Sequence, residues 1–225
     1  MFDAIAGRYD TLNHLLSAGL DRRWRQRAVR ELQLTGRERV LDVCTGTADL
    51  AIEAATSRHG AAHDVVGIDF AGEMLRRGLA KVRARGLASR VRIARGDAMA
   101  LPIGDASVDA AMVAFGIRNV ADPLAACREF RRVLRPGGRL AILKFGAPRI
   151  PGIRQAYDWY FRVVLPRVGR VVSHHTDAYS YLPASVQAFP APDVFAGHLR
   201  HEGFTDVRAV PLTLGIVYLY VAARS

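Results

Sequence analysis

The stretch VLDVCTGTAD, at residues 40–49, decides the predicted fold. An apolar run enters a short Thr/Gly turn, and a helical pattern begins at Asp49. Because Gly46 has no Cβ, its backbone can adopt positive φ and approach a ligand closely. With only one glycine, the turn is not the G-x-G-x-x-G of dinucleotide enzymes. An ordinary βα turn is the alternative interpretation.

Apolar runs alternate with helical patterns around this stretch, which is typical of βαβ units in a parallel sheet. We predict strands at residues 39–44, 64–69, 89–95, 107–113 and 139–145. We predict helices at residues 49–57, 71–85, 123–134 and 193–202. Two closing strands, at 205–210 and 215–222, are expected to form an antiparallel pair. The expected fold class is α/β: a Rossmann-like, seven-stranded, mostly parallel sheet with an antiparallel terminal strand.

The length of 225 residues fits a single domain with a full core. Residues 1–36 are helical and rich in arginine, and residues 146–190 are rich in Pro, Tyr, Phe and Arg. Ligands of open α/β sheets bind at the carboxyl edge, so we interpret both segments as coverings of that edge. The domain divides into a helical cap (1–36), a cofactor-binding core (37–145), a substrate-lid insertion (146–190) and a closing helix and strand pair (191–225).

Acidic residues end successive predicted strands. Asp69 ends the second strand, about twenty residues after the first motif, where an acid can accept both ribose hydroxyls of an adenosine cofactor. Asp97 ends the third, where an acid and adjacent backbone N–H groups can bind adenine. A solvent-facing aspartate is the alternative for either residue. No P-loop lysine, nucleophile elbow or HExxH helix is present. No metal is expected, since the His174–His175 pair is typical of a solvated loop.

The formal net charge of +11 indicates a polyanionic neighbour, either nucleic acid or an anionic membrane, or else a compositional bias toward arginine. The two cysteines, Cys44 and Cys127, lack the spacing of a disulfide framework and favour a reducing cytoplasm. No apolar run approaches the roughly 20 residues that span a bilayer, and residues 1–10 have no signal-peptide core.

Four longer stretches resemble one family over nearly the whole chain: FDAIAGRYDTLNHLLSAGLDRRWR (2–25), AFGIRNV (114–120), YDWYFRVVLPRVG (157–169) and DAYSYLPASVQAFP (177–190). They are similar to the quinone-biosynthesis C-methyltransferases, which are class I methyltransferases that use S-adenosylmethionine. Members of that family act on demethylmenaquinol and, in some organisms, on a polyprenyl methoxy-benzoquinol. The resemblance implies the same fold, the cofactor S-adenosyl-L-methionine, and a role in menaquinone or ubiquinone biosynthesis.

The resemblance also implies which residues form the site. The cofactor-contact positions are Thr47, Asp69, Asp97, Ala98 and Ala114. The positions that act on the quinol hydroxyl are Arg118 and Asn119. The positions near the substrate pocket are Tyr9, Asp177, Tyr179 and Tyr181. Guanidinium stays protonated, so Arg118 is expected to stabilise a phenolate and not to act as a base; a solvated loop arginine is the alternative.

The expected partners are a lipid-soluble quinol and, transiently, an anionic membrane surface at the inner face of the cytoplasmic membrane. No nucleic acid is expected, because the chain has no N-P-P-Y motif and no RNA-binding appendage. For the oligomeric state, the sequence is compatible with a monomer and with a homodimer. Another small aromatic acceptor is an alternative. A second alternative is a cofactor-binding scaffold without activity. It is suggested by four departures from the family pattern: Ala48, Ala114, Lys144 and Tyr220, where glycine, serine, glutamate and histidine are usual.

Overall fold

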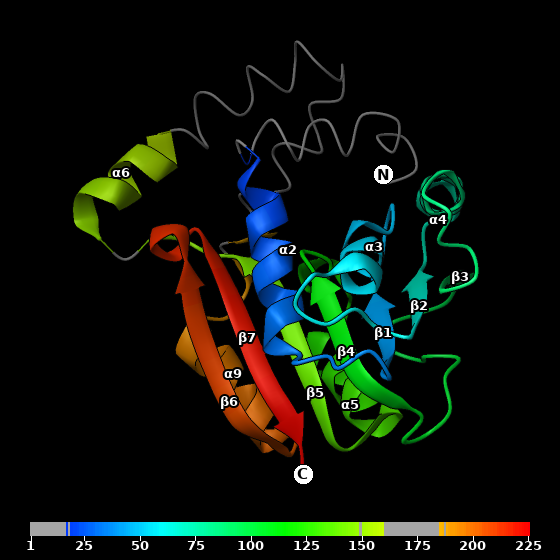
Figure 1. The fold of residues 1–225 in the computed structure, drawn as a ribbon. Coiled ribbons are helices and arrows are strands. Elements are labelled where there is room, and N and C mark those ends of the chain that lie inside the picture. Colours follow the sequence, from blue (N-terminus) through cyan, green and yellow to red (C-terminus); the bar gives the residue numbers. More distant parts are fainter. Residues whose placement is uncertain (1–16, 18, 149, 160–184, 187) are drawn as a thin grey trace.

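The computed structural model describes residues 17, 19–148, 150–159, 185–186 and 188–225. Its centre is one seven-stranded sheet with the order β3-β2-β1-β4-β5-β7-β6 (Figure 1). The strands are β1 (Arg39–Val43), β2 (Asp64–Asp69), β3 (Val91–Arg95), β4 (Val108–Ala114), β5 (Leu134–Phe145), β6 (Phe204–Leu212) and β7 (Val217–Arg224). The predicted seven-stranded α/β fold is thereby confirmed.

Helices cover both faces of the sheet, as Figure 1 shows. The helices are α2 (Leu20–Glu31), α3 (Asp49–Thr56), α4 (Gly72–Ala84), α5 (Pro123–Val133), α6 (Pro151–Trp159) and α9 (Pro192–His201). One apolar core lies between the sheet and α2, α3 and α4, and a second lies between the sheet and α5 and α9. No helix in the described ranges is long and apolar enough to span a membrane.

Strand β7 is the antiparallel member of the sheet. It pairs with β5 on one side and with β6 on the other, both in antiparallel register. The predicted pairing of the two closing strands is confirmed, but β7 lies inside the sheet and β6 forms its edge.

The predicted start of β5 at Arg139 was wrong. The strand begins at Leu134, because Leu134 pairs with Val108 before the Pro-Gly-Gly segment and pairing resumes at Arg139. The register shift between Val108 and Ala110 accommodates the extra residues, as a bulge does.

Helix α2 packs against the sheet as a core element. Trp24 is buried, and its indole N–H donates to Thr213 Oγ1 at 2.8 Å. The same ring meets Phe115 and Phe145 edge-on, with centroids 6.1 and 6.2 Å away. Helix α2 therefore braces the end of β4, where Phe115 begins the loop that follows. Helix α2, which falls within the predicted cap of residues 1–36, thus belongs to the layer of helices that covers one face of the sheet.

Candidate functional site

A cavity of about 300 Å³ lies at the carboxyl ends of the central parallel strands. The sheet order reverses between β1 and β4, and such a switch point is where open α/β folds bind ligands. The cavity is lined by residues from the ends of β1, β2, β3 and β4: Val43, Cys44, Gly46, Ile68, Asp69, Phe70, Ala71, Met74, Gly96, Asp97, Ala98, Met99, Ala114, Gly116, Asn119, Val120 and Ala121. We call it the cofactor pocket.

The turn after β1 has an unusual backbone. Cys44, Gly46 and Ala48 all have positive φ, at 54°, 55° and 66°. For the two non-glycine residues this conformation costs about 1–3 kcal/mol each and persists only where the surroundings enforce it. The predicted positive φ of Gly46 is confirmed. The turn brings the Gly46 N–H to Asp69 Oδ2 at 2.8 Å, so the first and second strand ends are joined directly.

Asp69 ends β2 with its carboxylate at the pocket. Oδ2 accepts the N–H of Gly46 and Oδ1 accepts the N–H of Ala71, both at 2.8 Å. A carboxylate has about four acceptor sites, so each oxygen can accept a further hydrogen bond. Two hydroxyl donors on neighbouring carbons, as a ribose presents, match this arrangement.

Phe70 follows Asp69 and is 69% exposed, although it is a large apolar residue. Its ring lies beside the pocket, and the guanidinium carbon of Arg95 is 5.1 Å from the ring centroid. An exposed aromatic ring at the mouth of a cavity provides a surface for a planar ligand. The sequence alone did not single out Phe70, because an aromatic residue after a strand is common in buried positions too.

The loop after β3 forms the next wall. Asp97 Oδ1 accepts the N–H of Met99 at 2.9 Å, and Asp97 and Ala100 form an isolated bridge. Asp97, Ala98 and Met99 all line the pocket. Met99 and Met74 add polarizable apolar surface that the sequence analysis missed, since nothing in the motif distinguishes a pocket methionine from one in the core.

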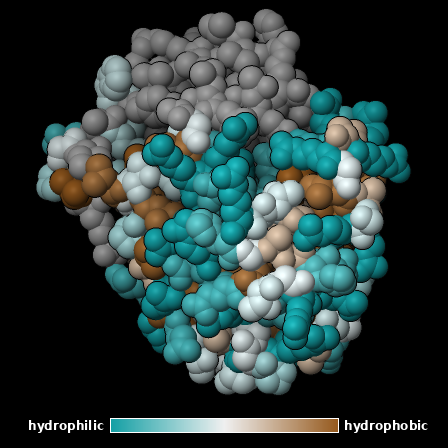
Figure 2. All heavy atoms as spheres, in the orientation of Figure 1, coloured by the Kyte–Doolittle hydropathy of each residue, from teal (hydrophilic) through white to brown (hydrophobic). Residues whose placement is uncertain are grey.

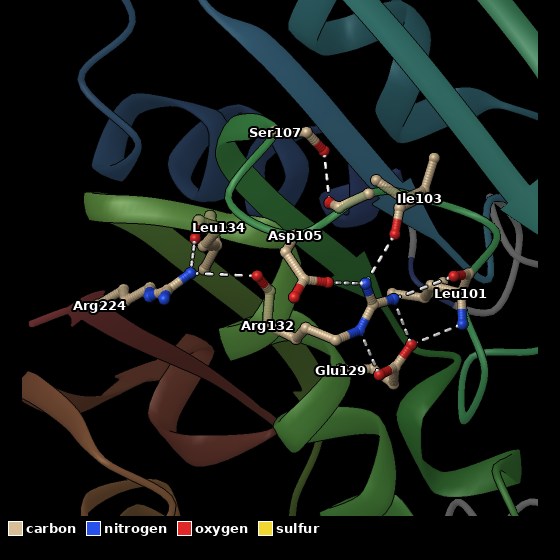
Figure 3. Close-up of polar contacts among 9 residues, drawn as sticks. Leu101, Ile103, Asp105, Ser107, Glu129, Arg132, Leu134 and Arg224 are labelled. Atoms are coloured by element: carbon tan, nitrogen blue, oxygen red, sulfur yellow. Dashed lines mark hydrogen bonds and ion pairs between the residues drawn. The ribbon is translucent and has the colours of Figure 1, made fainter.

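Arg132 on α5 fixes the continuation of this loop (Figure 3). Its guanidinium donates to Glu129 and Asp105 at 2.6–2.7 Å, and to the carbonyls of Leu101 and Ile103 at 3.0 and 2.8 Å. Glu129 in turn accepts the N–H of Leu101 at 2.7 Å. The carboxylates raise the pKa of Arg132, which stays charged. One side chain therefore ties residues 101–105 to α5.

Below the pocket, Asp42 is buried in β1. The hydroxyl of Thr45 donates to its Oδ2 at 2.6 Å. Burial raises the pKa of Asp42 to about 7, and the nearby charge of Asp69 acts in the same direction. Burial likewise raises the pKa of the Cys44 thiol far above its usual range, so Cys44 contributes to the pocket as an apolar group and not as a nucleophile.

A second cavity, of about 620 Å³, adjoins the first. Ala121 lines both. The remaining lining, which comes from η1, α5, α9 and the segment before α9, is mostly apolar: Arg118, Asp122, Pro123, Leu124, Ser185, Ala188, Phe189, Pro190, Phe195 and His198. We call this cavity the acceptor groove.

Arg118 and Asn119 lie in the short helix η1 (Ile117–Asn119), between the two cavities. Arg118 lines the groove, and Asn119 lines the cofactor pocket. Arg118 Nη1 donates to Asn119 Oδ1 at 3.1 Å and to Ser185 Oγ at 3.0 Å. The half-buried guanidinium is thus held in place, unlike that of a solvated loop arginine.

The chain after η1 is fixed by the start of α5. Asp122 caps the helix, since its carboxylate accepts the N–H groups of Leu124 and Ala125 at 2.8 and 3.0 Å. Pro123 takes the first helical turn, where its missing N–H costs nothing. The N–H of Ala125 lowers the pKa of Asp122.

The structure brings together most of the predicted site residues that it describes. Asp69, Asp97, Ala98, Ala114 and Asn119 line the cofactor pocket. Thr47 does not: it is 4% exposed, and its hydroxyl accepts a hydrogen bond from Lys81 Nζ at 3.1 Å.

Some predicted positions lie outside the described residues. They are the four substrate residues Tyr9, Asp177, Tyr179 and Tyr181, together with the His174–His175 pair. Within the described ranges, no group of three or more His, Cys, Asp or Glu side chains could hold a metal ion.

The four departures from the family pattern fall in different surroundings. Ala48 and Tyr220 are buried, and neither lines the cofactor pocket. Tyr220 packs on Phe195 with ring centroids 5.0 Å apart. Ala114 does line the pocket, at the end of β4. Lys144 is buried near the end of β5.

Comparison with known proteins decides the family. The model of the ubiE/COQ5 methyltransferase family matches residues 1–224. The chain belongs to this family. A ubiquinone/menaquinone biosynthesis C-methyltransferase of Geobacter sp. (strain M21) is 46% identical over all of this chain and 94% of its own length. A demethylmenaquinone methyltransferase of Thermus thermophilus is 46% identical over the full length of both chains.

A solved structure shares the fold. The SAM-dependent methyltransferase of Aquifex aeolicus has a TM-score of 0.62 at 19% identity, covering 89% of each chain. This ubiE/COQ5 family member is therefore a SAM-dependent methyltransferase with the expected fold. The pocket fits the cofactor, because Asp69 offers acceptors for ribose hydroxyls, Phe70 offers an aromatic surface, and Gly46 lets backbone approach closely.

Proposed function

We propose that this protein methylates a ring carbon of a polyprenyl hydroquinone, with demethylmenaquinol as the acceptor. The observation that carries the proposal is the position of Arg118 and Asn119, which lie between the cofactor pocket, where Asp69 and Asp97 present their carboxylates, and a mostly apolar groove. An isoprenoid quinol has one polar ring and an apolar tail, and the groove offers apolar surface with a cation at one end. The names of the relatives from Geobacter and Thermus thermophilus support the same acceptor class.

The chemistry needs positioning and charge stabilisation. S-adenosylmethionine, when bound, supplies an electrophilic methyl group. The acceptor carbon becomes nucleophilic when the neighbouring hydroxyl loses its proton. Arg118 would stabilise the resulting phenolate through a charge-assisted hydrogen bond. Asn119, already aligned by its bond to Arg118, would orient the hydroxyl. Holding the reacting atoms in line contributes about 7–11 kcal/mol to such reactions.

Single-turnover transfer of a labelled methyl group tests this proposal. Purified protein, labelled S-adenosylmethionine and reduced short-chain demethylmenaquinol should give methylated naphthoquinol. A demethylated methoxy-benzoquinol in a parallel reaction compares the two ring systems. Label on neither quinol, in protein that binds the cofactor by calorimetry, would contradict the proposal and favour another aromatic acceptor or a scaffold.

We also propose that the protein approaches an anionic membrane surface to reach its lipid acceptor. Helix α2 carries exposed arginines, among them Arg22, Arg23, Arg27 and Arg30. Figure 2 shows hydrophilic residues gathered over the face that carries α2. Basic residues near an anionic leaflet contribute about 1 kcal/mol each, and salt weakens the attraction. Co-sedimentation with anionic but not neutral vesicles at low salt is expected. Equal recovery with both would contradict it.

A further inference from the structure

A further cavity, of about 530 Å³, lies at the edge of the sheet opposite to the cofactor pocket. The parallel strands begin at this amino edge and run toward the carboxyl edge, which the arrowheads of β1, β2 and β4 mark in Figure 1. Arg39 begins β1 and lines this cavity, whereas Val43 ends β1 and lines the cofactor pocket. At about 3.3 Å per residue, roughly 13 Å separates these two positions. The cavity, which we call the edge cavity, is therefore distinct from the cofactor pocket.

Five neighbouring strands each supply one charged residue to the edge cavity from their first two positions. In the order β3-β2-β1-β4-β5 these residues are Arg92, Asp64, Arg39, Asp109 and Arg135, so positive and negative charges alternate. Asp64 Oδ2 lies 2.6 Å from Arg92 Nη2 and 3.3 Å from Arg39 Nε. Asp109 Oδ1 lies 2.6 Å from Arg135 Nη1, and its Oδ2 accepts the backbone N–H of Arg39 at 2.8 Å. Both carboxylates are thus engaged within this row of charges.

Two more arginines line the edge cavity without a carboxylate partner. Arg37 is exposed in the loop before β1. Arg90 directly precedes β3, and its Nη2 donates to the carbonyl of Ala62. Among the described residues, no carboxylate lies within ion-pair distance of either guanidinium. With five arginines against two aspartates, the described lining of the cavity has three positive charges in excess.

The loop that carries Arg37 is held in one shape by Glu38. The Glu38 carboxylate accepts the N–H groups of Thr35, Gly36 and Arg37 at 2.9, 3.0 and 3.1 Å, and the Thr35 hydroxyl at 2.6 Å. These donors engage the acidic residue next to Arg37 in the sequence, and Glu38 does not line the cavity. The guanidinium of Arg37 is therefore presented on an ordered loop and is available to a ligand.

A row of ion pairs that only stabilises the sheet edge is the alternative explanation. It accounts for the alternating residues of the five strands. It does not account for Arg37 and Arg90, which add charge to the same cavity without pairing. Positive charges gathered in a concave surface repel one another and attract anions. The excess charge therefore indicates a site for an anion.

We propose that the edge cavity binds a ligand that carries several phosphate groups. A guanidinium has five N–H donors and holds phosphate oxygens in pairs. A single phosphate carries about two negative charges at neutral pH, fewer than the excess of positive charge in this cavity. No Phe, Tyr or Trp is among the described residues that line it, so a stacked nucleobase is not expected. The ligand is thus recognised by its phosphates.

Two sources offer this chemistry: an oligophosphate that is free in solution, and the clustered headgroups of an anionic phospholipid. The acceptor groove includes Arg118 of η1, which follows the carboxyl end of β4. A membrane docked on the edge cavity would lie at the other edge of the sheet, away from that groove. We therefore expect the soluble oligophosphate.

Calorimetry with inorganic triphosphate as the probe tests the proposal without any turnover. The triphosphate should bind at one site per chain, about tenfold or more tightly than monophosphate, because it can form additional charge-assisted hydrogen bonds. Added salt should weaken the binding. The affinity for S-adenosylmethionine should be the same with and without triphosphate, since the two sites lie at opposite ends of β1. Equally weak binding of both phosphates, or competition with S-adenosylmethionine, would overturn the proposal.

Charge-matched variants locate the site. Arg37→Gln combined with Arg90→Gln should weaken triphosphate binding by about tenfold or more, the usual loss for charge-assisted hydrogen bonds. Arg37→Gln alone, at an exposed position, should show part of this loss in a protein of wild-type stability. The control is Arg22→Gln combined with Arg23→Gln, which removes two exposed arginines of α2 outside the cavity and should bind normally. Equal losses in the two double variants would show attraction to the net charge of +11 alone and would overturn the proposal.

Competition with vesicles distinguishes the two sources of phosphate. Triphosphate bound to the wild type, followed by 31P NMR, should stay bound when phosphatidylglycerol vesicles are added, which supports a soluble ligand. Displacement by these vesicles but not by phosphatidylcholine vesicles would support the same site with lipid headgroups as its ligand. Folded wild-type protein that binds no triphosphate, with or without vesicles, would overturn the proposal and leave the arginines as an ion-pair network of the sheet edge. None of these measurements depends on methyl transfer, so the proposed function is tested separately.

Discussion

Gly116 is packed so closely on Cys44 that a Cβ atom added to Gly116 would lie 2.2 Å from the Cβ of Cys44. Both residues line the cofactor pocket, one from the loop after β4 and one from the turn after β1. The two loops are therefore set against each other with no space for a further methyl group. The shape of the pocket floor depends on this contact.

Gly116→Ala should destabilise the protein by about 1–3 kcal/mol, the usual cost of overpacking a tight contact. It should also weaken S-adenosylmethionine binding by tenfold or more, because the turn that holds Cys44 and Gly46 must move. Gly197→Ala, in α9 with open space around the added Cβ, is the matched control and should bind normally. Urea unfolding and calorimetry measure both effects. Normal affinity in Gly116→Ala would show that the loops adjust without disturbing the pocket.

Asp69→Ala should weaken S-adenosylmethionine binding by roughly 100-fold, since hydrogen bonds to a charged group contribute about 1.5–3 kcal/mol each. Asp64→Ala is the control, because Asp64 begins the same strand and pairs with Arg92 at 2.6 Å. The control should bind the cofactor as the wild type does. Calorimetric titration compares the three proteins, and equal affinities would remove Asp69 from the site.

Arg132→Met should lower the free energy of unfolding by about 1.5–3 kcal/mol, because charged hydrogen bonds to Glu129 and to loop carbonyls are lost. Cofactor affinity should fall as well, since the same loop carries Asp97 and Met99. Arg128→Met, one helical turn earlier and exposed, should change neither quantity by much. A variant of Arg132 with full affinity would show that residues 97–99 hold their shape independently.

Asp42 should make the wild type less stable as the pH rises from about 4 to 7. Its carboxyl keeps its proton in the folded state up to about pH 7, whereas the unfolded chain releases it near pH 4. Unfolding therefore releases a proton in this range, and stability is lost as the pH increases. The variant Asp42→Asn has no carboxyl group at this position, so its folding releases or takes up no proton there. Urea unfolding at pH 4.5 and 7.5 should show a larger loss in the wild type than in Asp42→Asn; parallel curves would place the pKa of Asp42 in its ordinary range.

Arg118→Ala should reduce turnover of a short-chain demethylmenaquinol by about 100-fold or more, by analogy with removal of one oxyanion donor. Cofactor affinity should hardly change, because Arg118 lines the groove and not the cofactor pocket. Arg118→Lys should recover only part of the rate, since a point charge replaces a planar fork. A near-normal rate in Arg118→Ala would make this arginine a structural residue that holds Ser185 and Asn119.

Much of this fold follows from the sequence, because strand patterns and strand-end acids are local features. The predicted bounds of β2, residues 64–69, match those observed. Asp69 and Asp97 come together because parallel strands share one carboxyl edge. The early start of β5 could not be foreseen. A Pro-Gly-Gly segment indicates a turn, and only pairing with β4 shows that the strand continues through it.

The residues that line the pocket were harder to predict from the sequence than the strands were. Thr47 was placed at the cofactor by resemblance, and the structure turns its hydroxyl toward Lys81. Phe70 was missed, since its exposure depends on how the loop after β2 leaves the sheet. The brace between Trp24 and Phe115 joins residues 91 positions apart, and such a contact leaves no periodic signal in the chain.

The internal place of β7 has a consequence for how the protein is made. During synthesis β6 leaves the ribosome before β7, yet β6 touches the rest of the sheet only through β7. A nascent chain that ends within residues 213–216 thus has an open edge on β5 and an unattached strand. Both cores lack members of β7, among them Leu219 and Tyr220. A released chain truncated there should be protease-sensitive and chaperone-bound, and addition of the eight residues of β7 should close the domain in one step.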